Sequence, residues 1–274
     1  MFSKTMNAKF GFQFEKKVFF KSLRLLFNFR RSFVIAKHEL VLLFGNTSFG
    51  ALWQPISLSV TIFGIGVIFG NLFDLPVERY VPFLCIGMVL WQFLTSVLNE
   101  AAACYVIGGS HINTRYDEMI IFPIKIWAKH TAQLLLNFIV VVGVFLIFHI
   151  TVDFKNALLF IAGLLNFLIV HLFLSVLFSL IGAIFKDFVN VVRNILQLMF
   201  FITPIMWEPS GIEYHFLFFL NPLYHLIEMV RAPLLNQVMV IDDFYVIYAV
   251  ITIALSGAIL FCWSGLVWIV SYKS

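Results

Sequence analysis

From about residue 50 to its C-terminus, the chain alternates between long apolar runs and short polar gaps. Within the runs the apolar residues are continuous and do not alternate with polar ones, which favours helices over the strands of a membrane barrel. A helix needs about 20 apolar residues to cross roughly 30 Å of hydrocarbon. The runs predict six membrane-spanning helices, over Ala51–Phe73, Val81–Cys104, Trp127–Ile150, Ala157–Phe185, Val191–Trp207 and Phe244–Val270.

The segment between the last two predicted spans, 208–243, has a different pattern. Its apolar patches are interrupted by four helix-breaking residues, Pro209, Gly211, Pro222 and Pro233. Irregular backbone is tolerated at membrane depth where it is buried in protein or lines a cavity. We therefore predict a re-entrant segment, in which two short broken helices dip into the membrane and return to the same side.

The first residues of the chain carry cations among apolar side chains. From Phe14 to Arg31 the mixture is typical of a helix that lies in the headgroup layer, with its cations near anionic lipid. The stretch over residues 33–44 has the same character, and its Lys37, His38 and Glu39 are expected to face water. A disordered basic tail that only enforces topology is the alternative interpretation.

Composition supports a membrane protein. Charged residues make up 12% of the chain and aromatic residues 18%, whereas a soluble domain carries about 25% charged residues. With a mean hydropathy of +0.99, we expect lipid to surround most of the chain. The expected organisation is a cytoplasmic basic tail with the interfacial amphipathic helix over 1–49, and an all-α, polytopic six-span domain over 50–274. The three cysteines lie in apolar runs and are expected to be inert.

Lys and Arg are distributed unevenly across the predicted topology. Nine of the 18 precede Gly50, and with Arg115, Lys125, Lys129, Lys186, Arg193 and Lys273 they give 15 on one side of the membrane. The opposite side has three, Arg79, Lys155 and Arg231. Because cytoplasmic loops carry the excess of Lys and Arg, both termini are expected in the cytoplasm. The net charge of +4 then reflects the orientation of the chain in the membrane, and no nucleic-acid partner is expected. No signal peptide is expected either.

The candidates for chemistry inside the predicted spans are few, namely Glu100, His149, Asn166 and His171. They form no catalytic pattern, so no catalytic residue and no metal site are predicted. Glu100 either faces an aqueous path or reaches the interface, and His171 is expected to pack between helices. The phosphate-binding pattern GxxxxGK[ST] is absent. No cofactor is therefore expected in this chain, and any ATP and Mg²⁺ would be bound by another polypeptide.

The loop Gly108–Pro123 combines a flexible Gly-Gly start with a short amphipathic stretch that carries Arg115, Asp117 and Glu118. A charged helix at the membrane surface suits docking into a cleft of a soluble subunit. A solvated connector is an equally good interpretation of the same pattern.

Aromatic residues gather near span ends on the side opposite to this loop. Such residues usually anchor helices in the interface, and the alternative is that some line a pore and stack on sugar rings. They are Phe73, Tyr80, Trp91, Phe93, Phe200, Phe201, Trp207, Tyr214, Phe216, Phe218 and Phe219.

Three stretches in order resemble the membrane subunits of type-2 ABC exporters of lipid-linked polysaccharides, such as the permeases for O-antigen, capsule and wall teichoic acid. They are SFGALWQPI at Ser48–Ile56, Tyr80 with LCIGMVLWQF at Leu84–Phe93 and the loop ending at Pro123, and FFITPIMWEP at Phe200–Pro209 with LNPLYHLIEMVRAPLL at Leu220–Leu235. In the first stretch, Pro55 falls one residue earlier than in the family signature.

This resemblance implies a homodimer of six-span subunits around a channel in the bacterial inner membrane, with an ATP-binding subunit docked on each half. The implied contacts with the ATPase are Asn113, Arg115, Asp117 and Glu118. The implied channel and external gate are Tyr80, Trp91, Trp207, Phe216, Asn221, Pro222 and Arg231. Where the lipid-linked substrate enters, Arg30, Arg31 and Lys37 are candidates to contact its diphosphate.

We therefore interpret the sequence as the channel subunit of an ATP-driven exporter of lipid-linked polysaccharide. A type-2 ABC permease for a small drug or lipid shares the architecture and is the first alternative. An integral membrane transferase is the second, and it would need an acid–base cluster within the membrane that the sequence does not reveal.

Overall fold

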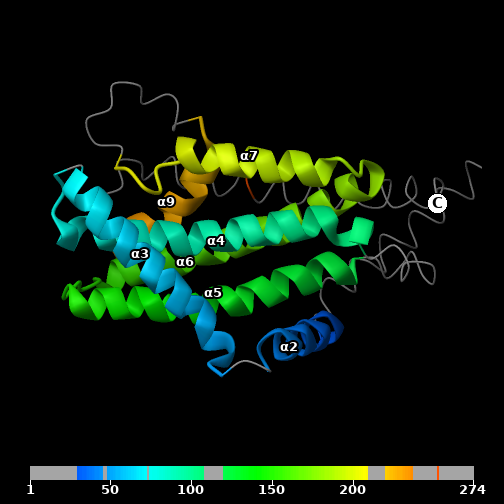
Figure 1. Ribbon diagram of the computed structural model, residues 1–274, viewed down its shortest axis with the longest axis horizontal. Helices are drawn as coiled ribbons and strands as arrows, with labels where there is room; N and C mark the ends of the chain where they lie inside the picture. The colour runs from blue at the N-terminus through cyan, green and yellow to red at the C-terminus, as the bar shows by residue number, and fades with distance from the viewer. Residues whose placement is uncertain are drawn as a thin grey trace, which may run out of the picture.

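The computed structural model describes residues 30–45, 48–72, 74–107, 120–208, 220–236 and Thr252. All regular structure in this part of the chain is helical, as predicted (Figure 1). The elements are α2 (Arg30–Phe44), the 3₁₀ turn η1 (Gly50–Leu52), α3 (Trp53–Leu72), α4 (Val77–Ile107), α5 (Ile121–Ile147), α6 (Phe154–Ile184), α7 (Phe188–Ile202) and α9 (Pro222–Leu234).

Four of the described segments are long and apolar enough to cross a membrane. They are Gly50–Leu72, Val77–Tyr105, Ile121–Ile147 and Phe154–Ile184. Each overlaps one of the first four predicted spans, so the continuous apolar runs located these helices correctly. The protein is therefore an all-helical membrane protein, with shorter helices packed beside the four long ones.

The fifth predicted span is shorter than expected. Helix α7 has 15 residues and measures about 22 Å at 1.5 Å per residue, whereas the prediction extended to Trp207. The helix ends at Ile202 because Pro204 disfavours helical dihedral angles at the residue before it. Thr203 accordingly adopts the extended conformation, with φ −82° and ψ 130°. The sixth predicted span lies outside the described residues except for Thr252.

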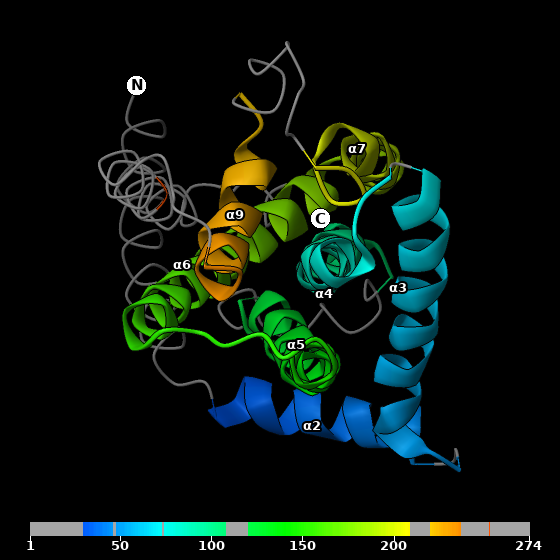
Figure 2. The same cartoon turned by 90° about the vertical axis from the view of Figure 1, so that its left-hand side faces the viewer.

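Helix α4 forms the centre of the bundle. Figure 2 looks almost along its axis and shows α7, α3, α5 and α6 around it. Its side chains Leu84, Ile86, Leu90 and Leu94 are fully buried. Helix α6 packs closely against α4 at Gly182, where an added Cβ would lie 2.0 Å from the carbonyl oxygen of Ala102. The packing therefore requires a residue without a side chain at that position.

Helix α3 crosses the front of the bundle diagonally, passing over α5 and α4 (Figure 1). It is reached from α2 through a turn in which Gly50 has φ +56°, in the left-handed region that glycine adopts without strain. This turn explains the glycine of the SFGALW stretch.

Helix α2 lies across the base of the bundle and packs against α5 (Figure 2). Its buried residues are Ser32 and Ala36, and the Ser32 hydroxyl donates to the carbonyl oxygen of Ile121 at 3.3 Å. Many of its other apolar side chains are exposed, including Phe33 at 48% and Leu42 at 66%. This is the pattern expected of a helix in contact with lipid. Of the predicted helix over 14–31, only its last two residues are described.

Candidate functional site

An ionic network joins α2, α4 and α5 near the end of the bundle where α4 ends and α5 begins. Lys125 Nζ lies 2.6 Å from Glu39 Oε1, and Lys129 Nζ lies 3.6 Å from Glu39 Oε2. Lys129 also donates to Glu100 Oε1. His130 Nε2 lies 2.7 Å from Glu100 Oε2. Two lysines and two carboxylates thus balance one another where three helices meet.

The network corrects the sequence-based expectation for Glu39 and gives Glu100 its partners. Glu39 was predicted to face water, but its carboxylate is held by two lysines of α5, whereas Lys37 and His38 are exposed as predicted. Glu100 does not stand alone, because it is paired with Lys129 and His130. Little in the sequence predicted this network, because Lys125 and Lys129 stood out only as two cytoplasmic charges four residues apart.

The network contains acidic and basic groups of the kind that a catalytic cluster would need. Its groups are engaged with one another, because both carboxylates are paired with lysines and His130 is held at both ring nitrogens, by Glu100 and by Gln133 Oε1 at 2.6 Å. An arrangement of this kind connects helices and presents no free nucleophile. Within the described residues, no group of His, Cys, Asp or Glu is placed to hold a metal ion.

The predicted contacts with an ATPase, Asn113, Arg115, Asp117 and Glu118, lie outside the described residues, as does Phe216. Asn113, Arg115, Asp117 and Glu118 belong to the stretch 108–119, which follows α4 and precedes α5 in the sequence. The candidate diphosphate contacts, Arg30, Arg31 and Lys37, are described and are exposed on α2.

At the opposite end of the bundle, Arg231 of α9 is completely buried. Its Nη1 donates to the carbonyl oxygen of Pro204 at 2.8 Å, and its Nε donates to Glu228 Oε2 at 2.9 Å. The guanidinium carbon lies 3.8 Å from the centre of the Phe83 ring. Arg231 therefore joins α9, α4 and the segment after α7.

Further bonds fasten the segment 203–208 to the same neighbours. The Tyr80 hydroxyl donates to the carbonyl oxygen of Met206, and Arg79 Nη2 lies 2.8 Å from Glu208 Oε2. Asn221 Nδ2 donates to Thr203 Oγ1 at 2.8 Å. Asn221 also caps α9, because its side chain accepts from the Leu223 N–H at 3.0 Å.

The structure thus brings several predicted gate residues together around one segment. Tyr80, Asn221 and Arg231 contact it from α4 and α9, Pro222 begins α9, and Trp207 belongs to the segment itself. Trp207 Nε1 donates to the carbonyl oxygen of Phe201 at 3.0 Å. Tyr80 and Arg231 are fully buried in the protein, so in this chain they hold backbone in place.

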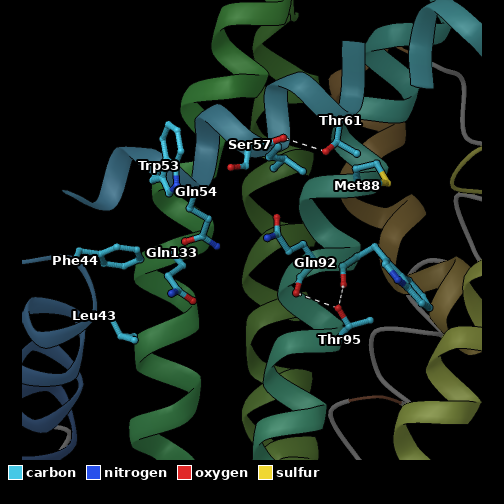
Figure 3. A pocket seen from close by; sticks show the side chains of 12 residues that line it. Leu43, Phe44, Trp53, Gln54, Ser57, Thr61, Met88, Gln92, Thr95 and Gln133 are labelled. Atoms are coloured by element: carbon cyan, nitrogen blue, oxygen red, sulfur yellow. Dashed lines mark hydrogen bonds between the residues drawn. The ribbon is translucent and has the colours of Figure 1, made fainter. Parts of the chain in front are cut away.

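Trp91 lies apart from this cluster and lines a groove of about 680 Å³. Figure 3 shows this groove from close by. Its indole packs against Phe200 of α7, with ring centres 5.7 Å apart. The groove runs between the end of α2 and helices α3, α4 and α5. Its lining residues are Leu43, Phe44, Trp53, Gln54, Ser57, Leu58, Thr61, Met88, Trp91, Gln92, Thr95 and Gln133.

His171 was predicted to pack between helices, and the structure confirms this. The side chain is fully buried beside the rings of Phe93 and Phe167, with ring centres 5.3 and 4.2 Å away. Its Nδ1 lies 2.7 Å from the carbonyl oxygen of Phe167. Buried among aromatic rings, it is not placed to exchange protons with a substrate.

Comparison with known proteins agrees with these features. The model of the family described as ABC-2 type transporter matches residues 30–235, from the start of α2 to the end of α9. The O-antigen export system permease protein RfbA of Klebsiella pneumoniae is 22% identical over 240 residues, which cover 83% of this chain and 90% of that protein. The matched domain is a transport permease without a catalytic domain, and such permeases pair with ATP-binding subunits. The chain is therefore a member of the ABC-2 type transporter family, as its sequence motifs indicated.

Proposed function

We propose that two copies of this chain form the channel of an ATP-driven exporter that moves a lipid-linked polysaccharide across the bacterial inner membrane. An ATP-binding subunit on each copy supplies the energy. The proposal draws on the family of the chain and on the O-antigen permease among its relatives. The excess of 15 cations over three across the predicted topology supports an orientation with both termini in the cytoplasm.

One observation carries the proposal of a channel. Asn190, Arg193, Asn194 and Gln197 are all exposed on α7. Their spacing of three, four and seven residues places them on one face of the helix. Polar and charged side chains are costly against lipid and usually face protein or a water-filled cavity. A polar passage that a second copy completes is the environment that suits this polar face.

The ionic network suggests how nucleotide-driven movement reaches the channel. In our proposal, the ATP-binding subunit pushes on the loop that carries Arg115 and Glu118. The adjoining ends of α4 and α5 then move together with α2, because Lys129 is paired with both Glu100 and Glu39. Movement of α2 displaces Arg30, Arg31 and Lys37, the proposed contacts for the substrate diphosphate.

At the other end, the segment 203–208 and α9 belong to the proposed external gate. Bonds between α9 and the segment 203–208, and from Arg79 and Tyr80 at the start of α4 to the same segment, support movement of these parts as one unit. Asn221 and Arg231 then serve the gate by fixing its backbone, and Trp207 and Phe216 are the proposed contacts of the exit with the glycan.

A second candidate function is export of a small hydrophobic molecule by the same architecture. It is favoured by an apolar cavity of about 320 Å³ between α5 and α6, which is lined by Phe138, Val141, Val142, Phe145, Leu146, Ile150, Val152, Ala157, Phe160 and Leu234. This cavity would suit an apolar ligand and offers a sugar no hydrogen-bond partner from its side chains.

Affinity purification of the chain from its own membrane in mild detergent tests the proposal. We expect an ATP-binding polypeptide to co-purify in equal number, with ATPase activity that belongs to that polypeptide. Reversing the loop charges with Arg115→Glu and Glu118→Arg should reduce its recovery. A stable chain that purifies without such a partner, and that turns over a lipid substrate alone, would contradict the proposal.

A further inference from the structure

Three glutamine side chains from three different helices extend into the groove that Trp91 lines. Gln54 belongs to α3, Gln92 to α4 and Gln133 to α5 (Figure 3). Gln92 Oε1 accepts from Asn137 Nδ2 at 3.4 Å, and Gln133 Oε1 lies 2.6 Å from His130 Nδ1. These bonds use the amide oxygens of Gln92 and Gln133 and hold both side chains in place, so that their N–H groups remain as donors.

Gln54 is different, because its Oε1 is buried and has no hydrogen-bond partner among the described residues. A buried acceptor without a partner costs free energy, about 1–3 kcal/mol in general, and such atoms in native proteins are usually explained by a water or a ligand. The groove therefore contains an acceptor that a hydroxyl donor would satisfy, next to amide donors from two other helices.

Aromatic rings flank these amides. The side chain of Trp53 is 55% exposed, and its indole stacks on Phe49 with ring centres 5.6 Å apart and 7° between the planes. This stacking orients the indole without burying it. Trp91 lines the groove from α4, but its indole is buried against Phe200 of α7. A flat indole face beside fixed amides offers both kinds of contact that a sugar ring makes, through its C–H faces and through its hydroxyl groups.

The charge of the groove narrows the class of ligand. None of its twelve lining residues is charged, and Ser57, Thr61 and Thr95 add hydroxyl groups to the three amides. A diphosphate would find no Lys or Arg there to pair with. An apolar drug would leave Gln54 Oε1 without a partner, whereas a neutral polyhydroxylated molecule would satisfy it. The volume of about 680 Å³ is in the range of known ligand sites.

We propose that this groove binds uncharged sugar units of the exported glycan, with Gln54, Gln92 and Gln133 hydrogen-bonded to ring hydroxyls and Trp53 beside the ring. The inference rests on the proposed function and adds the chemical class of the part of the substrate that is recognised. The diphosphate and the lipid are bound elsewhere. In this proposal the groove of each copy binds sugar weakly, which lets a polymer move on from one position to the next.

The test uses the full complex with its ATP-binding subunit in lipid nanodiscs, free of sugar-based detergent. Saturation-transfer difference NMR measures binding of three neutral hexasaccharides, built of glucose, galactose or mannose. Inorganic pyrophosphate and rhodamine 6G serve as competitors for the anionic and apolar classes. We expect at least one hexasaccharide to bind, and neither competitor to displace it.

Gln54→Leu and Gln92→Leu preserve side-chain size and should each weaken this binding about tenfold, the effect of losing one or two net hydrogen bonds. Asn71→Leu is the matched control, because Asn71 is an exposed amide on α3 outside the groove, bonded to the carbonyl oxygen of Val67 at 2.7 Å. It should leave binding unchanged. Melting temperatures of the variants check that each one folds.

Several results would overturn the inference. They are absence of binding by all three hexasaccharides, equal weakening by Gln54→Leu and Asn71→Leu, or displacement by pyrophosphate or rhodamine 6G. If any of these occurs while the ATP-binding subunit still co-purifies with the chain, the proposed function survives and only the sugar site is wrong. If that subunit is missing, the proposed function itself fails.

Discussion

Replacing Arg231 by methionine is the sharpest perturbation of the gate end of the molecule. The arginine is completely buried, and its guanidinium bonds to Glu228 and to the carbonyl oxygen of Pro204. Methionine fills a similar volume and is apolar, so Arg231→Met removes the charge and the hydrogen bonds while limiting the cavity that is left.

The magnitude follows from these contacts. Removing one partner of a buried ion pair generally costs about 3–5 kcal/mol, because the other charge stays buried without compensation. Glu228 keeps 20% of its side chain exposed and can be partly hydrated, which lowers the free-energy cost of leaving its charge unpaired. The carbonyl oxygen of Pro204 loses its partner, at roughly 1 kcal/mol, and the contact with the Phe83 ring is lost as well. We expect a total loss of about 4 kcal/mol.

The assay is thermal unfolding of the purified permease complex in nanodiscs, followed by the fluorescence of a thiol-reactive dye at the buried Cys85. For a chain of this size, 1 kcal/mol corresponds to about 2–4 °C. Arg231→Met should therefore lower the melting temperature by about 8 °C or more. Arg231→Lys should also destabilise, because a lysine lacks the planar fork that reaches Pro204 and Glu228 together.

A double variant separates charge from packing. Arg231→Met with Glu228→Met removes both members of the pair, and such replacements are often neutral or stabilising relative to the pair. It should recover at least about half of the stability lost in the single variant. If Arg231→Met melts within about 2 °C of the native protein, or if the double variant is the less stable, the buried pair does not hold α9 in place and the reasoning is refuted.

Two further changes probe the packing and the ionic network. Gly182→Ala would place its Cβ 2.0 Å from the Ala102 oxygen, and it should lower the free energy of unfolding by about 2–3 kcal/mol. Gly143→Ala is the control, because its Cβ would meet no atom within 4 Å, and it should not destabilise the protein. Equal melting temperatures of the two variants would argue against the close contact at Gly182. Lys129→Met should cost about 2 kcal/mol, a value reduced because Glu100 is partly exposed. Adding Glu100→Gln should restore part of it, and a double variant less stable than Lys129→Met would contradict the pairing.

The long helices were predictable because a membrane imposes a simple rule on sequence. Helix α6 needs only a continuous apolar run to be recognised, whatever it packs against. The end of α7 was placed too late, because Phe200 to Trp207 is apolar enough to continue a span and only the backbone restriction by Pro204 ends the helix. Hydropathy carries no information about that restriction.

The contacts between helices were not predictable in the same way. The pairing of Glu39 with Lys125 joins residues 86 positions apart, and no local pattern marks it. The motifs did indicate that Asn221 and Arg231 matter, yet their contacts with Thr203 and Pro204 became visible only when α9 was seen against the segment after α7. The three glutamines of the groove were overlooked because they lie on three separate helices.

The most direct test of the account is translocation of a radiolabelled lipid-linked glycan into proteoliposomes. Vesicles would contain this chain, its ATP-binding subunit, or both, and glycan inside the vesicles would be measured as label protected from an added glycosidase. The account predicts protection only with both polypeptides and hydrolysable ATP. Protection by this chain alone, or ATP hydrolysis by this chain alone, would contradict it.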